Sequence, residues 1–213
     1  MGKVADLNVK EAKRRKILNA ALKIFSRKGY GTAAIDEVAQ EAGIAKGTLY
    51  LYFRDKEDLF CSTIMYFIDN LAAYLKKHVD NNEGPLDILR SIAYHVLRFF
   101  LQNKDFFGIF QIFIHEDILC RHEELFKILL EKKKELLDYE HELVKRGQKE
   151  GVFRRDISTE DIVICFDGML TNTIHQFRTI GAFEPPKDVD VKILSLMKIF
   201  MHGISETGRN GEA

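Results

Sequence analysis

Apolar residues recur along most of this chain at the spacing of a helix rather than a strand. The first apolar stripe includes Ile17, Ala21 and Phe25, and basic residues lie before it. This pattern predicts an amphipathic helix over about 9–28, which Gly29 ends. No stretch alternates apolar and polar residues with a period of two, so we expect no β-sheet.

Two short helical stretches follow the first helix. They cover about 34–41 and 46–53, and the turn between them contains Gly43. Two short helices joined by a glycine-containing turn of three or four residues are typical of a helix-turn-helix. The sequence therefore predicts a small three-helix unit at the amino-terminal end.

In the remainder of the chain, the sequence pattern predicts further helices and no other kind of secondary structure. Residues that favour helix starts precede several of them: Asp55, Pro85, Asp105 and Ser158. The expected ranges run from Asp55 to about 79, from Pro85, from Asp105 to near 119, over 122–149, from Ser158 to about 179, and over 189–206. We predict an all-α fold of about nine helices: a helix-turn-helix domain at 1–55, called the head below, and a helical bundle at 56–213.

Composition narrows the class of protein. The 213 residues are 46% hydrophobic and 30% charged, which excludes a disordered or collagen-like chain. The three cysteines are widely spaced without a CxxC pair, which fits a reducing compartment. We see no signal peptide and no run of about 20 apolar residues, so we expect a soluble, cytoplasmic protein without a membrane partner.

The formal net charge is zero, but it is unevenly distributed. Residues 1–60 hold twelve Lys or Arg against eight Asp or Glu, and residues 1–33 hold nine against two. Such segregation indicates a nucleic-acid-facing end on a neutral protein, although a solvated helix face would give the same pattern. The basic run at 10–16 fits an arm that contacts the DNA backbone, or only a feature that aids solubility.

Residues 29–60 read GYGTAAIDEVAQEAGIAKGTLYLYFRDKEDLF. This segment resembles the DNA-binding signature of TetR-type bacterial transcriptional regulators, most specifically at 43–53 and 56–59, and the match covers about a quarter of the chain. The resemblance implies a double-stranded DNA operator as partner, a small molecule held in the carboxy-terminal bundle, and a homodimer formed through the last two helices.

The spacing of the third helix predicts which side chains face outward. Leu49 and Phe53 are four residues apart and point into the three-helix core. The remaining side chains then lie on the exposed side of a helix that is short enough to enter a major groove. Together with the resemblance, this side gives the expected DNA-binding residues: Thr32, Lys46, Gly47, Thr48, Tyr50, Tyr52 and Lys56.

Three positions depart from the usual pattern of the family. Ala33 and Ala34 stand where a Thr or Ser commonly caps the second helix, so that cap is lost or passes to Thr32. Ala45 likewise removes the usual cap of the third helix. Asp36 stands where some members carry a basic residue that reads a base, and a phosphate would repel its carboxylate. Alternatively, Asp36 and Glu37 simply favour the positive end of that helix.

A cluster of phenylalanines marks the bundle. Six of the sixteen lie within fifteen residues, which fits a plain core or an apolar cavity for a small molecule. The resemblance implies an effector such as an acyl or aromatic compound. Polar groups that could orient this ligand lie on nearby predicted helices. The candidate ligand-binding residues are His95, Phe99, Phe106, Phe110, Phe113, Asn172 and His175.

These features predict a ligand-responsive homodimeric repressor that leaves a pseudo-palindromic operator when a small apolar effector binds. For the dimer we expect the helices at about 159–179 and 189–206, where Gly168 allows close approach or marks a site without room for bulk. A second hypothesis is a DNA-bound protein whose bundle meets a protein partner instead. A helical enzyme is a distant third, because no catalytic motif, metal-ligand cluster or cofactor motif is present, and we expect no enzyme.

Overall fold

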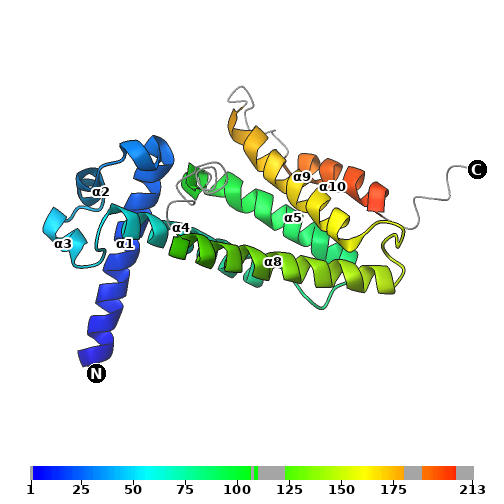
Figure 1. Ribbon diagram of the computed structural model, residues 1–213, viewed down its shortest axis with the longest axis horizontal. Helices are drawn as coiled ribbons and strands as arrows, with labels where there is room; N and C mark the ends of the chain where they lie inside the picture. The colour runs from blue at the N-terminus through cyan, green and yellow to red at the C-terminus, as the bar shows by residue number, and fades with distance from the viewer. Residues whose placement is uncertain (1, 107, 110–122, 180–188, 205–213) are drawn as a thin grey trace, which may run out of the picture. The chain divides into compact units, whose positions relative to one another are not determined.

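The computed structural model describes residues 2–106, 108, 109, 123–179 and 189–204. These residues form helices and turns without a β-strand, which confirms the predicted all-α class (Figure 1). No helix in these ranges combines the length and the apolar composition that crossing a bilayer requires. Contacts divide the chain into a first unit, drawn from 1–70 and 103–126, and a second unit, drawn from 71–102 and 127–213. The predicted division at residue 55 separates the chain by role and stays a prediction.

The first unit begins with the three helices of the head, blue to cyan in Figure 1. They are α1 (Gly2–Thr32), α2 (Ile35–Glu41) and α3 (Lys46–Tyr50), and α4 (Lys56–His78) follows. Helix α1 starts well before the expected residue 9. Its regular part still ends at Gly29, whose φ of 73° lies in the left-handed region that favours glycine. The third helix is shorter than expected, because residues 51–53 form a turn.

A compact apolar core holds these short helices together. Ile17 and Phe25 from α1, Val38 from α2 and Leu49 from α3 are all buried, and Phe53 lies with them beyond the end of α3. Five- and seven-residue helices are too short to be stable alone in water, so tertiary packing must stabilise α2 and α3. The core therefore determines which faces of α2 and α3 stay exposed.

Two of the predicted helix starts carry the expected side-chain caps. The Asp55 carboxylate accepts a hydrogen bond from the backbone N–H of Asp58 at 2.8 Å. The Ser158 hydroxyl oxygen accepts one from the backbone N–H of Asp161 at 3.0 Å. Each bond satisfies one of the backbone donors that a helix start leaves without a partner.

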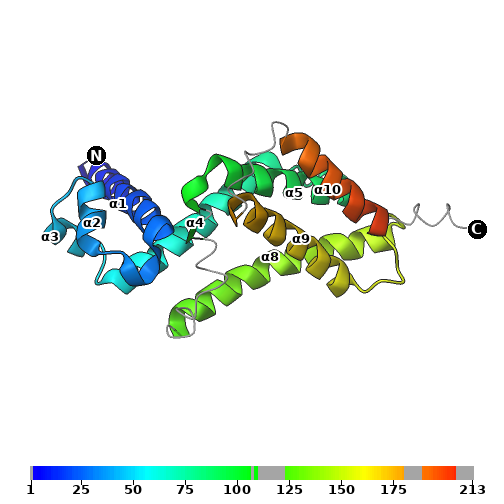
Figure 2. The same cartoon turned by 90° about the horizontal axis from the view of Figure 1, so that it is seen from above.

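The second unit contains most of the bundle. Its helices are α5 (Pro85–Gln102), α8 (Glu123–Lys149) from residue 127 on, α9 (Thr159–Thr179) and α10 (Val189–Ile204). Helix α5 packs against both α9 and α10 (Figure 2). The rings of Phe166 on α9 and Phe200 on α10 lie 5.4 Å apart. Most of the phenylalanine-rich helix predicted to start at Asp105 lies outside the described residues.

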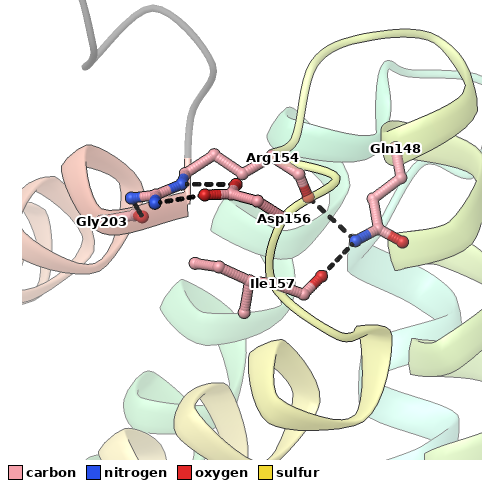
Figure 3. Close-up of polar contacts among 5 residues, drawn as sticks. All are labelled: Gln148, Arg154, Asp156, Ile157 and Gly203. Carbon is pink, nitrogen blue, oxygen red and sulfur yellow. Dashed lines mark hydrogen bonds and ion pairs between the residues drawn. The ribbon is translucent and has the colours of Figure 1, made fainter.

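A polar network ties the end of α8 to the start of α9 and the end of α10 (Figure 3). The Gln148 amide nitrogen donates hydrogen bonds to the carbonyls of Arg154 and Ile157, both at 2.9 Å. The Arg154 guanidinium pairs with both carboxylate oxygens of Asp156, at 3.0 and 2.8 Å. It also donates to the carbonyl of Gly203 at 3.3 Å. These bonds hold the loop between α8 and α9 against the last turn of α10.

Candidate nucleic-acid interface

Helix α3 divides its side chains between the core and solvent. Leu49 exposes 0% of its surface and Phe53 2%, so both pack inward as the sequence predicts. The next residue after Leu49, Tyr50, exposes 45%, and Leu51 exposes 78%. Tyr52 is half-buried. The outward side of α3 and of the turn that follows it therefore presents aromatic, apolar and polar side chains. The core of the head does not need them.

The first residues of α3 are also open to solvent. Lys46 is exposed, and its ammonium nitrogen lies 2.6 Å from a carboxylate oxygen of Asp36 on α2. That hydrogen bond, with the negative charge of Asp36, raises the pKa of Lys46. Gly47 is exposed, and a Cβ built on it would meet nothing within 4 Å, so this chain does not itself require a glycine there. Thr48 is half-buried.

The remaining predicted DNA contacts lie at the edges of this face. The Lys56 ammonium donates to the carbonyl of Gly31 at 3.1 Å and lies 4.7 Å from the centre of the Tyr30 ring. These two contacts hold Lys56 near the end of α1. Thr32 is exposed, and its hydroxyl donates to the carbonyl of Lys28 at 2.6 Å.

The start of α2 lacks a side-chain cap from the residue before it. Ala34 occupies the capping position without a side-chain hydrogen bond. Thr32 does not take over this role, because its hydroxyl bonds to α1 instead. The Glu37 carboxylate accepts from the Ala34 backbone N–H at 3.2 Å, which retains the reciprocal half of a capping box. Of the two outcomes that the sequence left open, the cap is lost.

Two acidic residues of α2 form ion pairs with lysines of α1. Glu37 pairs with Lys28 of α1, and Glu41 pairs with Lys23 of α1 at 3.0 Å. Exposed ion pairs of this kind contribute little to stability, but they do reduce the local positive field. The exposed lysines of the basic run lie elsewhere on α1: Lys10, Lys13 and Lys16.

One residue of the basic run contacts the head's core directly. The Arg14 guanidinium carbon lies 5.2 Å from the centre of the Phe53 ring. A cation over an aromatic face is attracted by the ring's quadrupole. The basic stretch of α1 is thus linked to the residue that anchors the end of α3.

Comparison with known proteins identifies this arrangement. Residues 17–62 match the family model described as bacterial regulatory proteins, tetR family. That range contains the whole helix-turn-helix, its core and the start of α4. Residues 17–62 therefore form a DNA-binding domain of the TetR family.

Relatives of the chain are also named as regulators. The uncharacterized HTH-type transcriptional regulator YerO of Bacillus subtilis is 26% identical over 209 residues, which cover 93% of this chain and 68% of YerO. Relatives that are 31–35% identical match over only 33–52% of their own length. These relatives are transcriptional regulators and not enzymes. This chain is likewise a transcriptional regulator and not an enzyme.

Solved structures of regulators share the fold of the whole chain. The ketosteroid transcriptional regulator KstR2 of Mycobacterium tuberculosis aligns with a TM-score of 0.73 at 22% identity, over 91% of this chain and 95% of KstR2. The regulator FadR of Bacillus subtilis, in complex with stearoyl-CoA, aligns with a TM-score of 0.70 at 20% identity, over 89% of this chain and 98% of FadR. The fold of these regulators therefore extends through the bundle.

The predicted ligand-binding residues are divided between the two units, and two of them lie outside the described residues. In the second unit, His95 and the buried Phe99 both lie against Tyr74, with ring centres 5.9 and 5.3 Å away. Phe106 is buried in the first unit, 5.4 Å from the ring of Phe67. Phe110 and Phe113 lie outside the described residues.

The two candidates on α9 differ in their surroundings. His175 is half-buried, whereas Asn172 is exposed. Asn172 follows Ile164 and Gly168 at intervals of four residues, so the three lie on one face of α9. A Cβ on Gly168 would meet nothing within 4 Å, so lack of room within this chain does not explain that glycine.

Sequence reasoning missed three features of the bundle and the head. His78 lies 5.0 Å from His95, ring to ring, and burial lowers the pKa of His95, with the charges of His78 and Arg98 adding to the effect. Glu140 is buried, and its Oε2 has no hydrogen-bond partner among the described residues. The third is the pair of Asp36 with Lys46. Each depends on contacts between helices, which no local motif signals.

Proposed function

We propose that this TetR-family protein is a cytoplasmic homodimeric repressor. Its head binds a pseudo-palindromic DNA operator, and a small apolar effector bound in the bundle releases it. The effector must bind the released form more tightly than the DNA-bound form, since equal affinity would shift nothing. We keep the division by role at residue 55, with DNA binding before it and ligand binding and dimerisation after it.

The two-sided character of α3 supports DNA binding by the head. Tyr50 stands beside the fully buried Leu49 and still exposes 45% of its surface. Lys46, Gly47 and Thr48 open the same helix. A helix that offers donors on one side and packs on the other can enter a major groove without loss of its core. Tyr52, Lys56 and Thr32 at the edges suit contacts to phosphates.

Exposed apolar residues on the last two helices support the homodimer. Ile164 on α9 and Val191, Leu194 and Ile199 on α10 each expose more than half of their surface. Gly168 on α9 has open space beside it. Large apolar side chains gathered on two helices favour an interaction surface over solvent exposure. A two-fold pairing would place two heads roughly 34 Å or more apart on DNA.

The related folds support an apolar effector. FadR of Bacillus subtilis holds stearoyl-CoA, and KstR2 is named for ketosteroids. Ketosteroids and the stearoyl chain are both large and apolar, although coenzyme A itself is charged. In this chain His95 and Phe99 lie against the ring of Tyr74, and His78 lies beside His95, so a few polar groups stand among aromatic rings. This composition is typical of small-molecule sites.

Binding to promoter fragments tests the proposal. The wild-type protein should give a salt-sensitive shifted complex, because counterions are released from DNA. Lys46→Ala and Tyr50→Ala should each weaken binding by about 1–3 kcal/mol and leave the fold and the dimer intact. Lys145→Ala is the matched control: Lys145 is also exposed and paired with a carboxylate, Glu142 at 2.8 Å, but lies on α8.

Absence of any salt-sensitive complex, or equal loss in the Lys145 control, would contradict DNA binding by the head. Loss of folding in Tyr50→Ala would show that the exposed face was misassigned.

A protein partner for the bundle is the second candidate function. The same exposed residues of α9 and α10 form an outward apolar surface, which a different chain could cover as well as a second copy. Sedimentation of the purified protein separates the two. A stable dimer supports the first proposal, and a monomer would favour the protein partner.

A further inference from the structure

Two opposite charges meet on the exposed side of the helix-turn-helix. Asp36 is the second residue of α2, and Lys46 is the first residue of α3. Their side chains are 66% and 54% exposed, and the Lys46 nitrogen lies 2.6 Å from the Asp36 oxygen. The turn between the two helices brings them together, so the pair forms only when the head is folded.

Asp36 differs from the other acidic residues of α2. Glu37 and Glu41 pair with lysines of α1, a helix that is not expected to enter the groove. Asp36 pairs instead with α3, the helix expected to enter the groove. The exposed ion pair stabilises the fold little, and what stability the carboxylate adds comes from its place at the positive end of α2. A carboxylate near phosphates is also unfavourable unless it has a partner at the DNA surface.

The pair matches a specific edge of the major groove. Guanine presents O6 and N7 as acceptors there, and its partner cytosine presents the N4 amino group as donor. Guanine O6 and cytosine N4 are themselves joined by a hydrogen bond of about 2.9 Å. Lys46 and Asp36 place a donor and an acceptor at almost the same separation. Lysine to guanine and aspartate to cytosine are the usual pairings of these side chains.

We propose that Asp36 and Lys46 act as one reading unit that selects a G·C pair in each half-site, with Asp36 determining the specificity. This inference rests on the proposed function, because it requires that α3 enter the groove. Lys46 donates to guanine and Asp36 accepts from cytosine while the two stay paired. Without Asp36, the lysine is a lone positive charge that binds phosphates and base acceptors of many sequences.

The carboxylate therefore trades affinity for selectivity. Asp36 cancels one positive charge on the reading face of each head. Its removal should strengthen binding to random DNA and steepen the salt dependence, since each further phosphate neutralised adds about 0.9 to the slope. At the same time, discrimination at one base pair should fall. A residue that only stabilised the head would lower binding to all sequences equally.

Selection from a randomised double-stranded DNA library tests this inference with the full-length protein. The wild type should enrich a G·C pair at one position in each half-site. Asp36→Asn should shift this preference toward A·T, because an asparagine amide pairs with adenine. Asp36→Ala should reduce the discrimination roughly tenfold, the lower range for one good base contact. Glu41→Gln removes the same charge from the same helix and should keep the wild-type preference.

The outcomes separate this inference from the proposed function. If Tyr50→Ala weakens binding but Asp36→Asn and Asp36→Ala keep the wild-type preference at every position, the reading unit is wrong and the DNA-binding head stands. If Glu41→Gln changes the preference as Asp36→Asn does, the effect is one of general charge, and the reading unit is again wrong. If the wild type enriches no sequence and Tyr50→Ala changes nothing, the proposed function fails together with this inference.

Discussion

The head and the second unit present their functional groups in opposite ways. In the head, the candidate DNA contacts stand on the outside of a small core, and most of them lie within one continuous stretch from Lys46 to Tyr52. In the second unit, the candidates come from two helices: His95, Phe99 and His175 lie at least partly buried, and Asn172 alone is exposed. An exposed reading face is a local property of one short helix. A ligand site inside a bundle is a property of several helices packed together.

The two regions also differ in how clearly function separates from stability. Leu49 and Tyr50 are neighbours, yet one is fully buried and the other is exposed. Around His95 the same side chains would serve as core and as ligand wall. Substitutions should therefore separate binding from folding in the head more cleanly than in the second unit.

The sharpest test of that contrast is the replacement of Leu49 beside Tyr50. Leu49→Ala removes a fully buried side chain and should lower the free energy of unfolding of the head by roughly 2–5 kcal/mol. Tyr50→Ala should change it by less than about 0.5 kcal/mol, since surface substitutions usually do. Thermal unfolding followed by circular dichroism, with DNA binding measured in parallel, checks both.

Both variants should lose operator affinity, but only Leu49→Ala should lose it through unfolding. Equal destabilisation by the two substitutions would show that Tyr50 belongs to the core and would remove the distinction between the two faces.

Glu140 provides the opposite case, a charged group hidden within the second unit. It exposes 3% of its surface. Burial raises the pKa of Glu140 to about 8, and the negative charge of Asp167 adds to the rise. In the unfolded chain the carboxyl ionises near pH 4.5, so between pH 4.5 and 8 unfolding releases a proton and stability falls as the pH rises. Below that window both states are protonated, and above it both are ionised.

Glu140→Gln should remove this pH dependence. Relative to the wild type, the variant should gain roughly 3–4 kcal/mol in unfolding free energy between pH 5 and pH 8. Urea unfolding at both values measures the gain. Glu142→Gln on the same helix replaces an exposed carboxylate and serves as the control. If the wild type and Glu140→Gln lose stability in parallel as the pH rises, Glu140 is not the buried acid described here.

The second unit resembles the head in one respect, because it also exposes apolar side chains. We expect a smaller effect from substitutions of these residues. Ile199 on α10 exposes 71% of its surface. Ile199→Glu should raise the dissociation constant of the proposed dimer at least about tenfold, because the charge would be buried without a partner. Sedimentation equilibrium measures this change. Leu136→Glu places the same charge on an exposed leucine of α8 and should leave the dimer unchanged. Dissociation by both variants would place the interface elsewhere.

The sequence predicted well what depends on neighbouring residues. The caps at Asp55 and Ser158, the break at Gly29 and the inward direction of Leu49 and Phe53 each follow from spacing within a few residues. The start of α1 was missed, because residues 2–8 carry neither a cap nor an apolar stripe that would signal a helix.

What the sequence could not predict depends on the angles between helices. The pairing of Asp36 with Lys46 requires the geometry of the turn between α2 and α3. The contact of His78 with His95 requires the packing of α4 on α5. The burial of Glu140 is hidden in a strongly charged segment whose other acids are exposed. Side chains far apart along the chain carry no mutual spacing from which such contacts could be inferred.

Chemical protection of a selected operator duplex tests the central claim most directly. Dimethyl sulfate methylates guanine N7 in the major groove and adenine N3 in the minor groove. A head that inserts α3 should protect guanine N7 in two half-sites about one helical turn or more apart, and Tyr50→Ala should abolish that protection at concentrations where Lys145→Ala retains it. Protection confined to adenine N3, or guanine protection that persists in Tyr50→Ala, would contradict major-groove binding through this face.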